Sequence, residues 1–350
     1  MAAAPSSKDA VRRREGNTPS DIPHLEYQLI DKHSQIKPVL DEIRRSQDTS
    51  PFLAVDLEGE SLSRKGELSI VSIATDDDIY LFDIKKLGRE VFDKGLKSIL
   101  EDSSRDKIMF DCRQDADCLW HQFRVRLANV LDLQLMEIIH KEEHPDPEYP
   151  ERYEIPNLGS FLYCLKRYVK DETLIAKKEA GKYMMSADGV WLARPLKDVL
   201  LQYAACDVRG FFQLFRQLKD GLDGQGMQRL RIASKVYLDF QRARFRRYFD
   251  EFETNKYLPM YVIPAKGSLV FPHRNKECVG CLRDFQRSDF SKNQLRLRTQ
   301  KCVVCKRVKK SMEAQARWEE REQEREQEWL VASEADGYDS DGREIMFDFY

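Results

Sequence analysis

The stretch Phe52-Leu-Ala-Val-Asp56-Leu-Glu58-Gly-Glu60 begins as an apolar strand and ends in acidic side chains. Asp56 and Glu58 are two residues apart, so on an extended chain both carboxylates point to the same face. An apolar core disfavours two like charges held so close together, whereas a bound cation would reverse the sign of that cost. A lone Asp-x-Glu is also typical of a strand that ends in a polar turn at Gly59. A metal site therefore requires further carboxylates from elsewhere in the chain.

The composition is that of a globular and highly charged chain. Of its 350 residues, 41% are hydrophobic and 34% are charged, with a formal net charge of -2. This is enough chain for one or two domains with a hydrophobic core. No run approaches the ~18 apolar residues of a membrane span, and the first residues lack the apolar core of a secretory signal. We therefore expect an intracellular protein with no membrane partner, in the nucleus or the cytoplasm.

The hydrophobic pattern around the acidic strand predicts an α/β fold. Strand-like runs at residues 52–57, 68–74 and 79–84 are joined by short turns, which indicates an antiparallel meander. Because helices and strands alternate after them, we expect the first of these strands in the centre of the sheet. The other predicted elements are helices at residues 24–45, 90–100, 115–123, 135–140, 157–168 (with Asn157 as its cap) and 196–218, and strands at residues 107–110 and 130–133.

Two other segments supply carboxylates for the acidic strand. Asp207 lies in the last of these helices, on the same face as Tyr203 four residues earlier. Asp115 begins the helix at residues 115–123, where an acid either caps the helix or joins a metal site. Asp111 and Asp117 are rival acids in the same turn. Each acid is weak evidence alone, but their order along an α/β chain adds weight.

That order resembles the DEDDy 3′-to-5′ exonucleases, the superfamily of ribonuclease D and the proofreading domains, over about residues 25–220. The three motifs are Val55-Asp56-Leu57-Glu58, Ile108-Met-Phe-Asp-Cys-Arg-Gln-Asp115-Ala-Asp-Cys-Leu119 and Tyr203-Ala-Ala-Cys-Asp207. Segments 129–134 and 191–196 also resemble the connections between the family's motifs. The phrase Asp111-Cys-Arg113-Gln-Asp115 is most similar to the branch that contains Egalitarian and the exonuclease-domain-containing proteins of RNA metabolism. Many relatives carry histidine where this chain has Phe110, a departure that removes no metal ligand.

The resemblance implies a ribonuclease H-like mixed sheet flanked by helices, and a two-metal exonuclease. It implies that two Mg²⁺ or Mn²⁺ ions are held by the carboxylates of Asp56, Glu58, Asp115 and Asp207. Asp56 would bridge both ions. Hard cations prefer carboxylate oxygens, and two of them about 4 Å apart can hold the attacking and leaving oxygens of a phosphodiester in line. Tyr203 would orient the attacking water, since a phenol pKa near ~10 makes proton abstraction at neutral pH less favourable.

The implied substrate is single-stranded nucleic acid, RNA rather than DNA, and the implied products are 5′-mononucleotides. A non-catalytic RNA-binding adaptor on the same scaffold is the alternative, because some members of this branch have lost catalytic acids. This chain keeps all five positions of the motifs, which favours an enzyme.

Four cysteines form a separate pattern near the C-terminus. Cys278-Val-Gly-Cys281 and Cys302-Val-Val-Cys305 are two Cys-x-x-Cys pairs separated by 20 residues, which is the spacing of a four-thiolate zinc ribbon. Because four thiolates complete a tetrahedron, we expect one structural Zn²⁺ with no part in catalysis. Asp289-Phe-Ser-Lys-Asn-Gln-Leu295 resembles the core of the Stc-type zinc domains, over about residues 277–306.

The region around the cysteines is strongly basic. Residues 266–310 hold 13 Lys and Arg against three acids, a balance of +10. This face either binds phosphates or only keeps a protein-binding ribbon soluble, and on the same chain as a nuclease the first role is favoured. The candidate nucleic-acid contacts are Arg296, Arg298, Lys301, Lys306 and Arg307.

The remaining segments are defined by their charge. A basic helix at about residues 227–252 is either a solvated outer face or a ridge that contacts phosphates. Residues 331–350 hold six acids and one arginine, a balance of -5. There are two alternatives for this tail. Its apolar end binds a protein partner, or the tail competes with nucleic acid for the basic ribbon. The predicted parts are a disordered N-terminus (1–23), an exonuclease domain (24–222), a basic helical extension (223–265), the Cys₄ zinc ribbon (266–310), and a charged helix with a mobile acidic tail (311–350).

Overall fold

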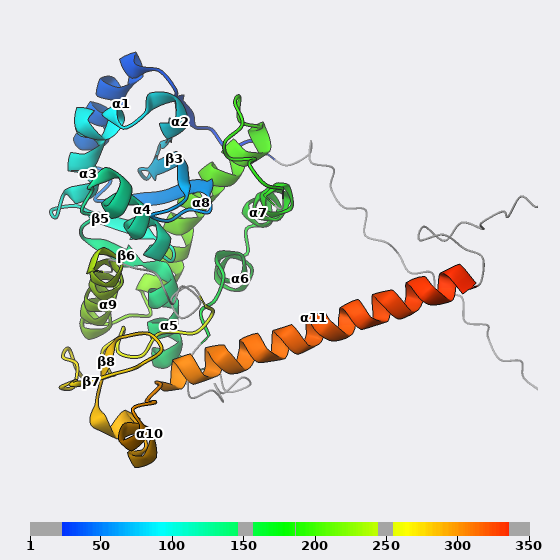
Figure 1. The fold of residues 1–350 in the computed structure, drawn as a ribbon. Helices are drawn as coiled ribbons and strands as arrows, with labels where there is room; N and C mark the ends of the chain where they lie inside the picture. Colours follow the sequence, from blue (N-terminus) through cyan, green and yellow to red (C-terminus); the bar gives the residue numbers. More distant parts are fainter. Residues whose placement is uncertain (1–22, 146–156, 186, 244–254, 336–350) are drawn as a thin grey trace, which may run out of the picture. The chain divides into compact units, whose positions relative to one another are not determined.

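The computed structural model describes residues 23–145, 157–185, 187–243 and 255–335. The chain divides into two compact units, which are drawn in Figure 1. The acidic motifs lie in the first unit and the four cysteines in the second. Among the described helices, none combines the length and the apolar character that a membrane crossing needs. The predicted disordered N-terminus and acidic tail, and most of the loop at residues 144–153, fall outside the described residues.

The first unit is built on a six-stranded sheet. Its strands are β1 (Gln28–Ile30), β2 (Phe52–Glu60), β3 (Glu67–Ala74), β4 (Ile79–Asp83), β5 (Asp106–Met109) and β6 (Val130–Asp132), in the spatial order β1-β4-β3-β2-β5-β6. The antiparallel meander β2-β3-β4 and the central place of β2 are confirmed. β5 pairs in parallel with both β2 and β6, and β1 pairs in parallel with β4, so the sheet is mixed.

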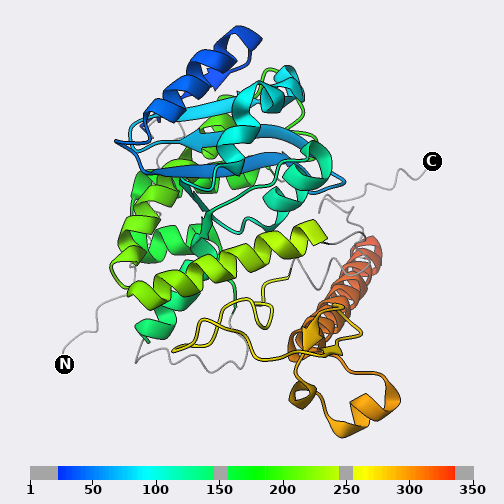
Figure 2. The same cartoon turned by 90° about the vertical axis from the view of Figure 1, so that its left-hand side faces the viewer.

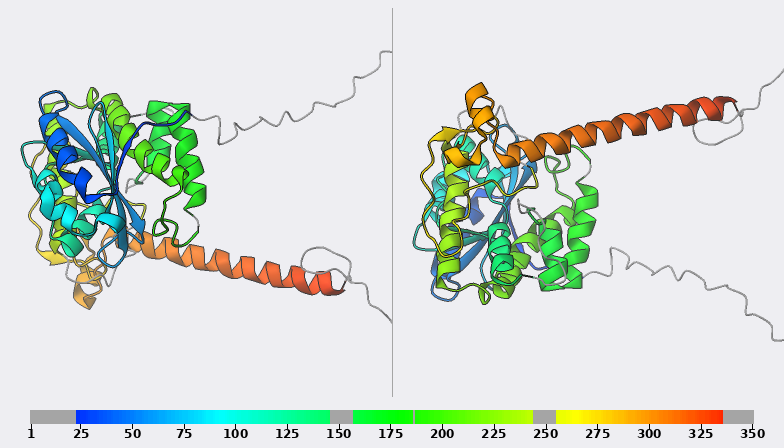
Figure 3. Two further views of the ribbon diagram at one scale, coloured as in Figure 1. Left: turned by 90° about the horizontal axis from the view of Figure 1, so that it is seen from above. Right: turned by 90° about the horizontal axis from the view of Figure 1, so that it is seen from below.

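Helices cover both faces of this sheet. They are α1 (His33–Arg45), α2 (Ile84–Leu87), η2 (Phe92–Leu96), α3 (Lys97–Glu101), α4 (Arg113–Phe123), α5 (Leu133–Glu143), α6 (Phe161–Cys164), η3 (Leu165–Val169), α7 (Glu172–Met184), α8 (Asp198–Lys219) and α9 (Gly224–Ala243). The long helix α8 packs across β2, β3, β4 and β5. The left view of Figure 3 shows α1 on one side of the strands and the green helices α6, α7 and α8 on the other. The predicted α/β fold with a flanked mixed sheet is therefore confirmed.

The N-terminal part of the predicted helix at residues 24–45 is wrong. Residues 28–30 form strand β1, and the helix begins only at His33. Ile30 is fully buried while Gln28 is exposed, which is the alternation of an edge strand rather than of a helix. The side-chain oxygen of Gln35 accepts hydrogen bonds from the backbone N–H groups of Asp31 and Lys32, and so closes the turn between strand and helix.

Between residues 157 and 184, one prediction is wrong and one helix was missed. Ser160, not Asn157, caps the helix that follows: its hydroxyl accepts a hydrogen bond from the backbone N–H of Tyr163. Asn157 instead forms an isolated β-bridge with Tyr257 in the second unit. Helix α7 was not predicted at all, because its apolar residues form no clear stripe.

Helix α9 belongs to the first unit, where it packs on α4, α5 and β6. Figure 2 shows it as the long yellow-green helix beside the strands. The predicted continuation of this helix to residue 252 lies outside the described residues. Its described basic side chains are held by acids of the same unit: Arg229 by Glu142 and Glu143, Arg231 by Asp106, and both Lys235 and Arg242 by Asp239.

The second unit has a small core around the four cysteines. Its described elements are β7 (Lys276–Glu277), β8 (Asp284–Phe285), η5 (Arg287–Asp289), α10 (Lys292–Leu297) and α11 (Val303–Ala335). Phe285, Phe290 and Val304 are buried against the cysteines. Helix α11 begins within the second Cys-x-x-Cys pair, and its later turns are exposed and charged, as the composition of residues 311–331 predicted.

Candidate active site

The carboxylates of Asp56, Glu58 and Asp207 meet at the end of β2. Each offers an oxygen, and these oxygens all lie within 4.8 Å of one another. Asp56 and Glu58 project from the same strand, as their spacing predicted. Asp207 comes from α8, where the small residues Ala204 and Ala205 are fully buried and let the helix approach the sheet closely.

Asp115 reaches the same strand from α4, although it is not among the three acids grouped within 4.8 Å. Burial raises the pKa of Asp115, and the backbone N–H of Leu57, which lies between Asp56 and Glu58, is among the groups that oppose this shift. Asp115 is 6% exposed. Its charge raises the pKa values of both Asp56 and Glu58, after larger contributions from burial and other neighbours. All four predicted acids therefore interact at one end of β2.

Asp111 and Asp117, the other acids near the start of α4, are each paired with an arginine. Asp117 is fully buried and accepts hydrogen bonds from Arg64, from its backbone N–H at 2.6 Å and its Nη2 at 2.7 Å. Asp111 accepts a hydrogen bond from Arg113 Nη2 at 2.6 Å. An acid that is already paired with an arginine gains little from a further cation, so Asp115 is the better candidate ligand.

Asp132 holds the turn that presents Asp115. Its carboxylate accepts hydrogen bonds from the backbone N–H of Cys112 at 2.8 Å and of Gln134 at 2.9 Å. It therefore ties the start of α4 to the start of α5. Burial and the nearby charge of Asp111 raise the pKa of Asp132 to about 6, although hydrogen bonds from Cys112 and from the backbone of Leu135 oppose the shift.

The four site acids are costly to ionise together. Burial, and then the charge of Asp207, raise the pKa of Glu58 to about 8. Burial raises the pKa of Asp115 to about 8 as well, against the stabilising hydrogen bonds of its own and Leu57 backbone N–H groups. The pKa values of Asp56 and Asp207 are also raised, chiefly by burial. The fold thus brings together acids that repel one another, an arrangement that clusters at functional sites.

The residues present fit divalent cations. Asp115 Oδ1 and Asp207 Oδ1 are buried and have no hydrogen-bond partner among the described residues. Buried polar atoms are nearly always paired, so each unpaired oxygen calls for an explanation. A hard cation that takes oxygen ligands supplies one, because it would both coordinate these atoms and offset the repulsion among the acids.

Tyr203 lies beside the acids, on the same helix as Asp207, and is 6% exposed. Burial, and then the charge of Asp207, raise its pKa above the ordinary value. A phenol with a raised pKa stays protonated at neutral pH, so its hydroxyl is available as a hydrogen-bond donor rather than as a base, which is the predicted orienting role. The ring of Trp191 lies 6.3 Å from the ring of Tyr203, centroid to centroid.

Lys178 is a site residue that the sequence did not predict. It lies on α7, and its Nζ donates hydrogen bonds to Tyr203 Oη and to Asp207 Oδ2, the second at 2.5 Å. Its side chain is 13% exposed. No local pattern in the sequence distinguishes Lys178 from a surface lysine.

Neighbouring motif residues have structural roles. Phe110, which replaces the histidine of many relatives, packs against the rings of Phe161 and Phe211 at 5.3 and 6.4 Å between centroids. Arg194 makes a bidentate ion pair with Asp83 at the end of β4, with both distances 2.7 Å. These contacts hold the segments that flank the site acids, but neither Phe110 nor Arg194 is part of the acidic group.

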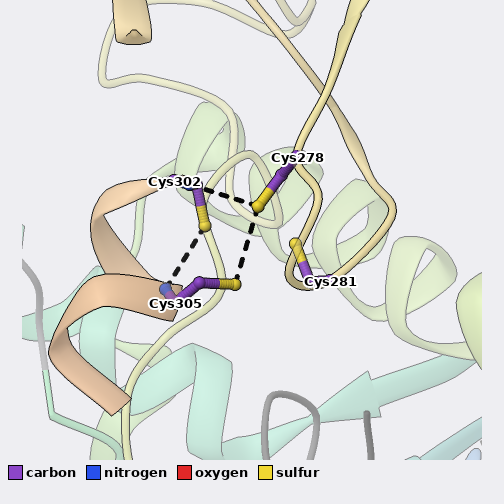
Figure 4. A group of neighbouring side chains, drawn as sticks. All are labelled: Cys278, Cys281, Cys302 and Cys305. Carbon is purple, nitrogen blue, oxygen red and sulfur yellow. Dashed lines mark hydrogen bonds between the residues drawn. The ribbon is translucent and has the colours of Figure 1, made fainter. Parts of the chain in front are cut away.

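The four cysteines of the second unit converge on one point, as Figure 4 shows. All four sulfur atoms lie within 4.8 Å of one another. The backbone N–H groups of Gly280 and Cys302 donate to Cys278 Sγ at 3.4 and 3.1 Å. A β-carbon on Gly280 would lie 2.9 Å from Cys305 Sγ, so this position favours glycine. The group is compatible with a small tetrahedral zinc module.

The predicted nucleic-acid contacts lie around this cysteine group. Arg296, Arg298, Lys306 and Arg307 are exposed, and Lys301 is half-buried. Arg298 ends α10 with a positive φ of 55°, and it follows the exposed side chain of Leu297. The surface is thus accessible, basic and partly apolar.

The fold and the acids define a class, the DEDDy-type 3′-5′ exonucleases, and comparison of the sequence with protein families agrees. Residues 27–223, more than half of the chain, match the 3′-5′ exonuclease family, and the chain belongs to that family. The matched residues contain all five positions of the three motifs.

The chain is also similar to individual proteins of known name and to solved structures. The piRNA biogenesis protein EXD1 of Mus musculus is 32% identical over 193 residues, which cover 54% of this chain and 32% of the mouse protein. RNase D of Trypanosoma brucei in complex with GMP has a TM-score of 0.53 at 26% identity, covering 62% of this chain and 64% of that chain. Its complex with RNA U12 has a TM-score of 0.52 at 26% identity, covering 62% and 70%. The matched part thus spans about a third of the mouse relative.

Proposed function

We propose that this chain is a metal-dependent 3′-to-5′ exonuclease that shortens single-stranded nucleic acid, RNA in preference to DNA, and releases 5′-mononucleotides. The observation that carries the proposal is the convergence of four buried or half-buried carboxylates from β2, α4 and α8. Without a cation such a group destabilises the fold, so its presence points to a function that needs it.

The four acids Asp56, Glu58, Asp115 and Asp207 would hold two Mg²⁺ or Mn²⁺ ions. When bound, such ions neutralise the phosphate and lower the pKa of the attacking water. The unpaired oxygens of Asp115 and Asp207 are the atoms best placed to serve as ligands. The protein's part is to hold these oxygens in a fixed arrangement, with Asp115 presented by the turn that Asp132 holds.

Tyr203 supplies a hydrogen-bond donor next to the acids. Its proton is held firmly, so its hydroxyl acts as a donor that orients the attacking water or a phosphate oxygen. Its burial keeps bulk water from competing for that hydrogen bond. This role needs correct geometry rather than a change in the charge of the phenol.

Two observations support RNA as the substrate class. The RNase D of Trypanosoma brucei has been captured in complex with RNA U12, and the mouse relative EXD1 is named as a piRNA biogenesis protein. Exposed arginines and lysines around the cysteine group would contact the phosphate backbone independently of base sequence. One structural Zn²⁺ would hold that surface together.

The setting is proposed to be intracellular. All eight cysteines are buried, and four of them form the group compatible with zinc. Paired Cys-x-x-Cys motifs that bind metal are typical of reducing compartments, where disulfides are rare. The acidic tail remains a candidate for binding a protein partner.

A second candidate is a non-catalytic RNA-binding adaptor. One observation favours it: the ammonium of Lys178 already pairs with Asp207, so part of the acidic charge is balanced without any metal. An adaptor would keep the fold and the basic surface without turnover.

The two candidates are separated by incubating the full chain with RNA and DNA of one sequence, labelled at the 5′ end, in Mg²⁺ or Mn²⁺. An exonuclease shortens the labelled strand stepwise and releases 5′-mononucleotides that chromatography identifies. A strand with a blocked 3′ end serves as the control, and it should resist. Binding of the RNA without any shortening in either metal would favour the adaptor.

A further inference from the structure

One cation of the chain itself enters the acidic group. Lys178 Nζ donates hydrogen bonds to Tyr203 Oη and to Asp207 Oδ2. The ammonium also lies 3.8 Å from the centre of the Tyr203 ring. Its side chain is only 13% exposed, so these contacts are largely shielded from water. A shielded ammonium beside acids acts on their chemistry more strongly than a surface lysine would.

The direction of these hydrogen bonds has a chemical consequence. An ammonium has three donors and no acceptor, so Tyr203 Oη is the acceptor in its contact with Lys178. The hydrogen of the tyrosine hydroxyl therefore remains available to donate to a water or a phosphate oxygen. Lys178 thus holds Tyr203 in the state that the proposed reaction requires.

The contact with Lys178 uses only one of the two carboxylate oxygens of Asp207. Oδ2 accepts the hydrogen bond from Lys178, while Oδ1 is buried and has no partner among the described residues. The free oxygen is left for a metal. The neighbouring positive charge makes the acidic group less negative, which weakens its attraction for a second positive charge.

We propose that Lys178 is a positioning residue that keeps Tyr203 as a hydrogen-bond donor and lowers the affinity of the acidic group for divalent cations. The effect on turnover rests on the exonuclease function proposed above. The effect on cation affinity rests on the acidic group alone and holds whether or not the chain cleaves nucleic acid.

The chain offers a matched control in the preceding residue. Lys177 lies on the same helix, is 6% exposed and donates a hydrogen bond from Nζ to Gln202 Oε1 at 2.7 Å. Gln202 in turn accepts from and donates to the backbone of Leu25, outside the acidic group. Removing either lysine therefore takes one partly buried ammonium from α7, but only Lys178 contacts an acid of the site and the tyrosine.

The experiment compares Mn²⁺ binding and turnover in the zinc-loaded full chain and in three variants, Lys178→Met, Lys178→Arg and Lys177→Met. Free Mn²⁺ is measured by electron paramagnetic resonance. We expect Lys178→Met to bind Mn²⁺ about tenfold more tightly than the wild type, and Lys177→Met to be unchanged. Lys178→Arg keeps the charge, so its Mn²⁺ affinity should stay near that of the wild type. Turnover at saturating Mn²⁺ should fall about 10- to 100-fold in both Lys178 variants, because the tyrosine loses its support.

Each outcome decides one part of the proposal. Equal Mn²⁺ affinity in Lys178→Met and Lys177→Met would overturn the role in cation affinity. Wild-type turnover in Lys178→Met at saturating Mn²⁺ would overturn the positioning role. If Lys178→Met does not fold, Lys178→Arg still tests positioning, since its charge is retained and its geometry is not. If the wild type cleaves nothing, the exonuclease proposal fails, while the comparison of Mn²⁺ affinities still tests the effect of the charge.

Discussion

Gly181 lies against the ring of Tyr203, so closely that a β-carbon on Gly181 would sit 2.1 Å from Cδ2 of the tyrosine. Gly181 is three residues after Lys178, on the same face of α7. The backbone of α7 therefore supports the ring of the tyrosine while Lys178 contacts its hydroxyl. A single helix thus determines where the hydroxyl of Tyr203 points.

Substitution of Gly181 by alanine should displace Tyr203 without changing any charge. We expect turnover to fall about 100-fold, since small misplacements of a reacting group are that costly. The overpacking should lower the free energy of unfolding by about 1–3 kcal/mol. Mn²⁺ affinity should be unchanged. Nuclease assays and thermal unfolding measure both effects, and wild-type turnover in this variant would show that α7 does not position the tyrosine.

Two substitutions of site acids should change stability in opposite directions. Asp56→Asn removes one of several mutually repelling charges, so the protein without added Mg²⁺ or Mn²⁺ should melt at a higher temperature. Asp207→Asn removes the carboxylate that neutralises the largely buried ammonium of Lys178, which should cost about 3 kcal/mol. Both variants should lose cleavage. A shift of the two melting temperatures in the same direction would contradict the described charge balance.

The stability of the protein without added Mg²⁺ or Mn²⁺ should fall as the pH rises. The pKa of Glu58 is raised from 4.5 to about 8 by burial and by Asp207, and that of Asp115 is raised to about 8 by burial. Folding therefore favours the protonated acids, so their stability contribution is complete below about pH 4 and is lost as the pH rises through 8. The melting temperature should decrease over that range.

Glu58→Gln is the control for this pH dependence. It cannot ionise, so its melting temperature should decrease less between pH 5 and pH 8 than that of the wild type. Added Mn²⁺ should also reduce the decrease, because a bound cation favours the ionised acids. A wild-type melting temperature that is constant or rises over this range would be evidence against the raised pKa values.

The cysteine group should bind one Zn²⁺ per chain. Cys302→Ser should lose that zinc in elemental analysis, and the second unit should become sensitive to proteolysis, because closed zinc sites stabilise folding directly. Cys164→Ser changes a buried thiol of the first unit and should keep the zinc. Both variants should still cleave short oligonucleotides if the zinc is purely structural. Zinc retained by Cys302→Ser would remove that cysteine from the ligand set.

The acids could be predicted because their signals are local. Asp56 and Glu58 follow a buried apolar strand, and Tyr203 and Asp207 share a helix face, so periodicity alone placed each pair correctly. Resemblance to a known family joined the pairs and added Asp115. The central place of β2 followed from the alternation of strands and helices.

The residues that were missed depend on contacts distant in sequence. Lys178 contacts residues 25 and 29 positions away, and nothing in the sequence around α7 indicates that contact. Strand β1 has three residues, and its existence depends on pairing with β4 about fifty residues later. Such pairings are decided by tertiary structure, which overrides local propensity.

The central claim is that Asp56, Glu58, Asp115 and Asp207 together form a divalent cation site. The most direct test is an anomalous difference map from crystals of the full chain soaked in Mn²⁺ and a 5′-mononucleotide. We predict two peaks among these four carboxylates, with Asp115 Oδ1 and Asp207 Oδ1 among the ligands. Crystals that bind the nucleotide but show no peak among the four acids would contradict the claim.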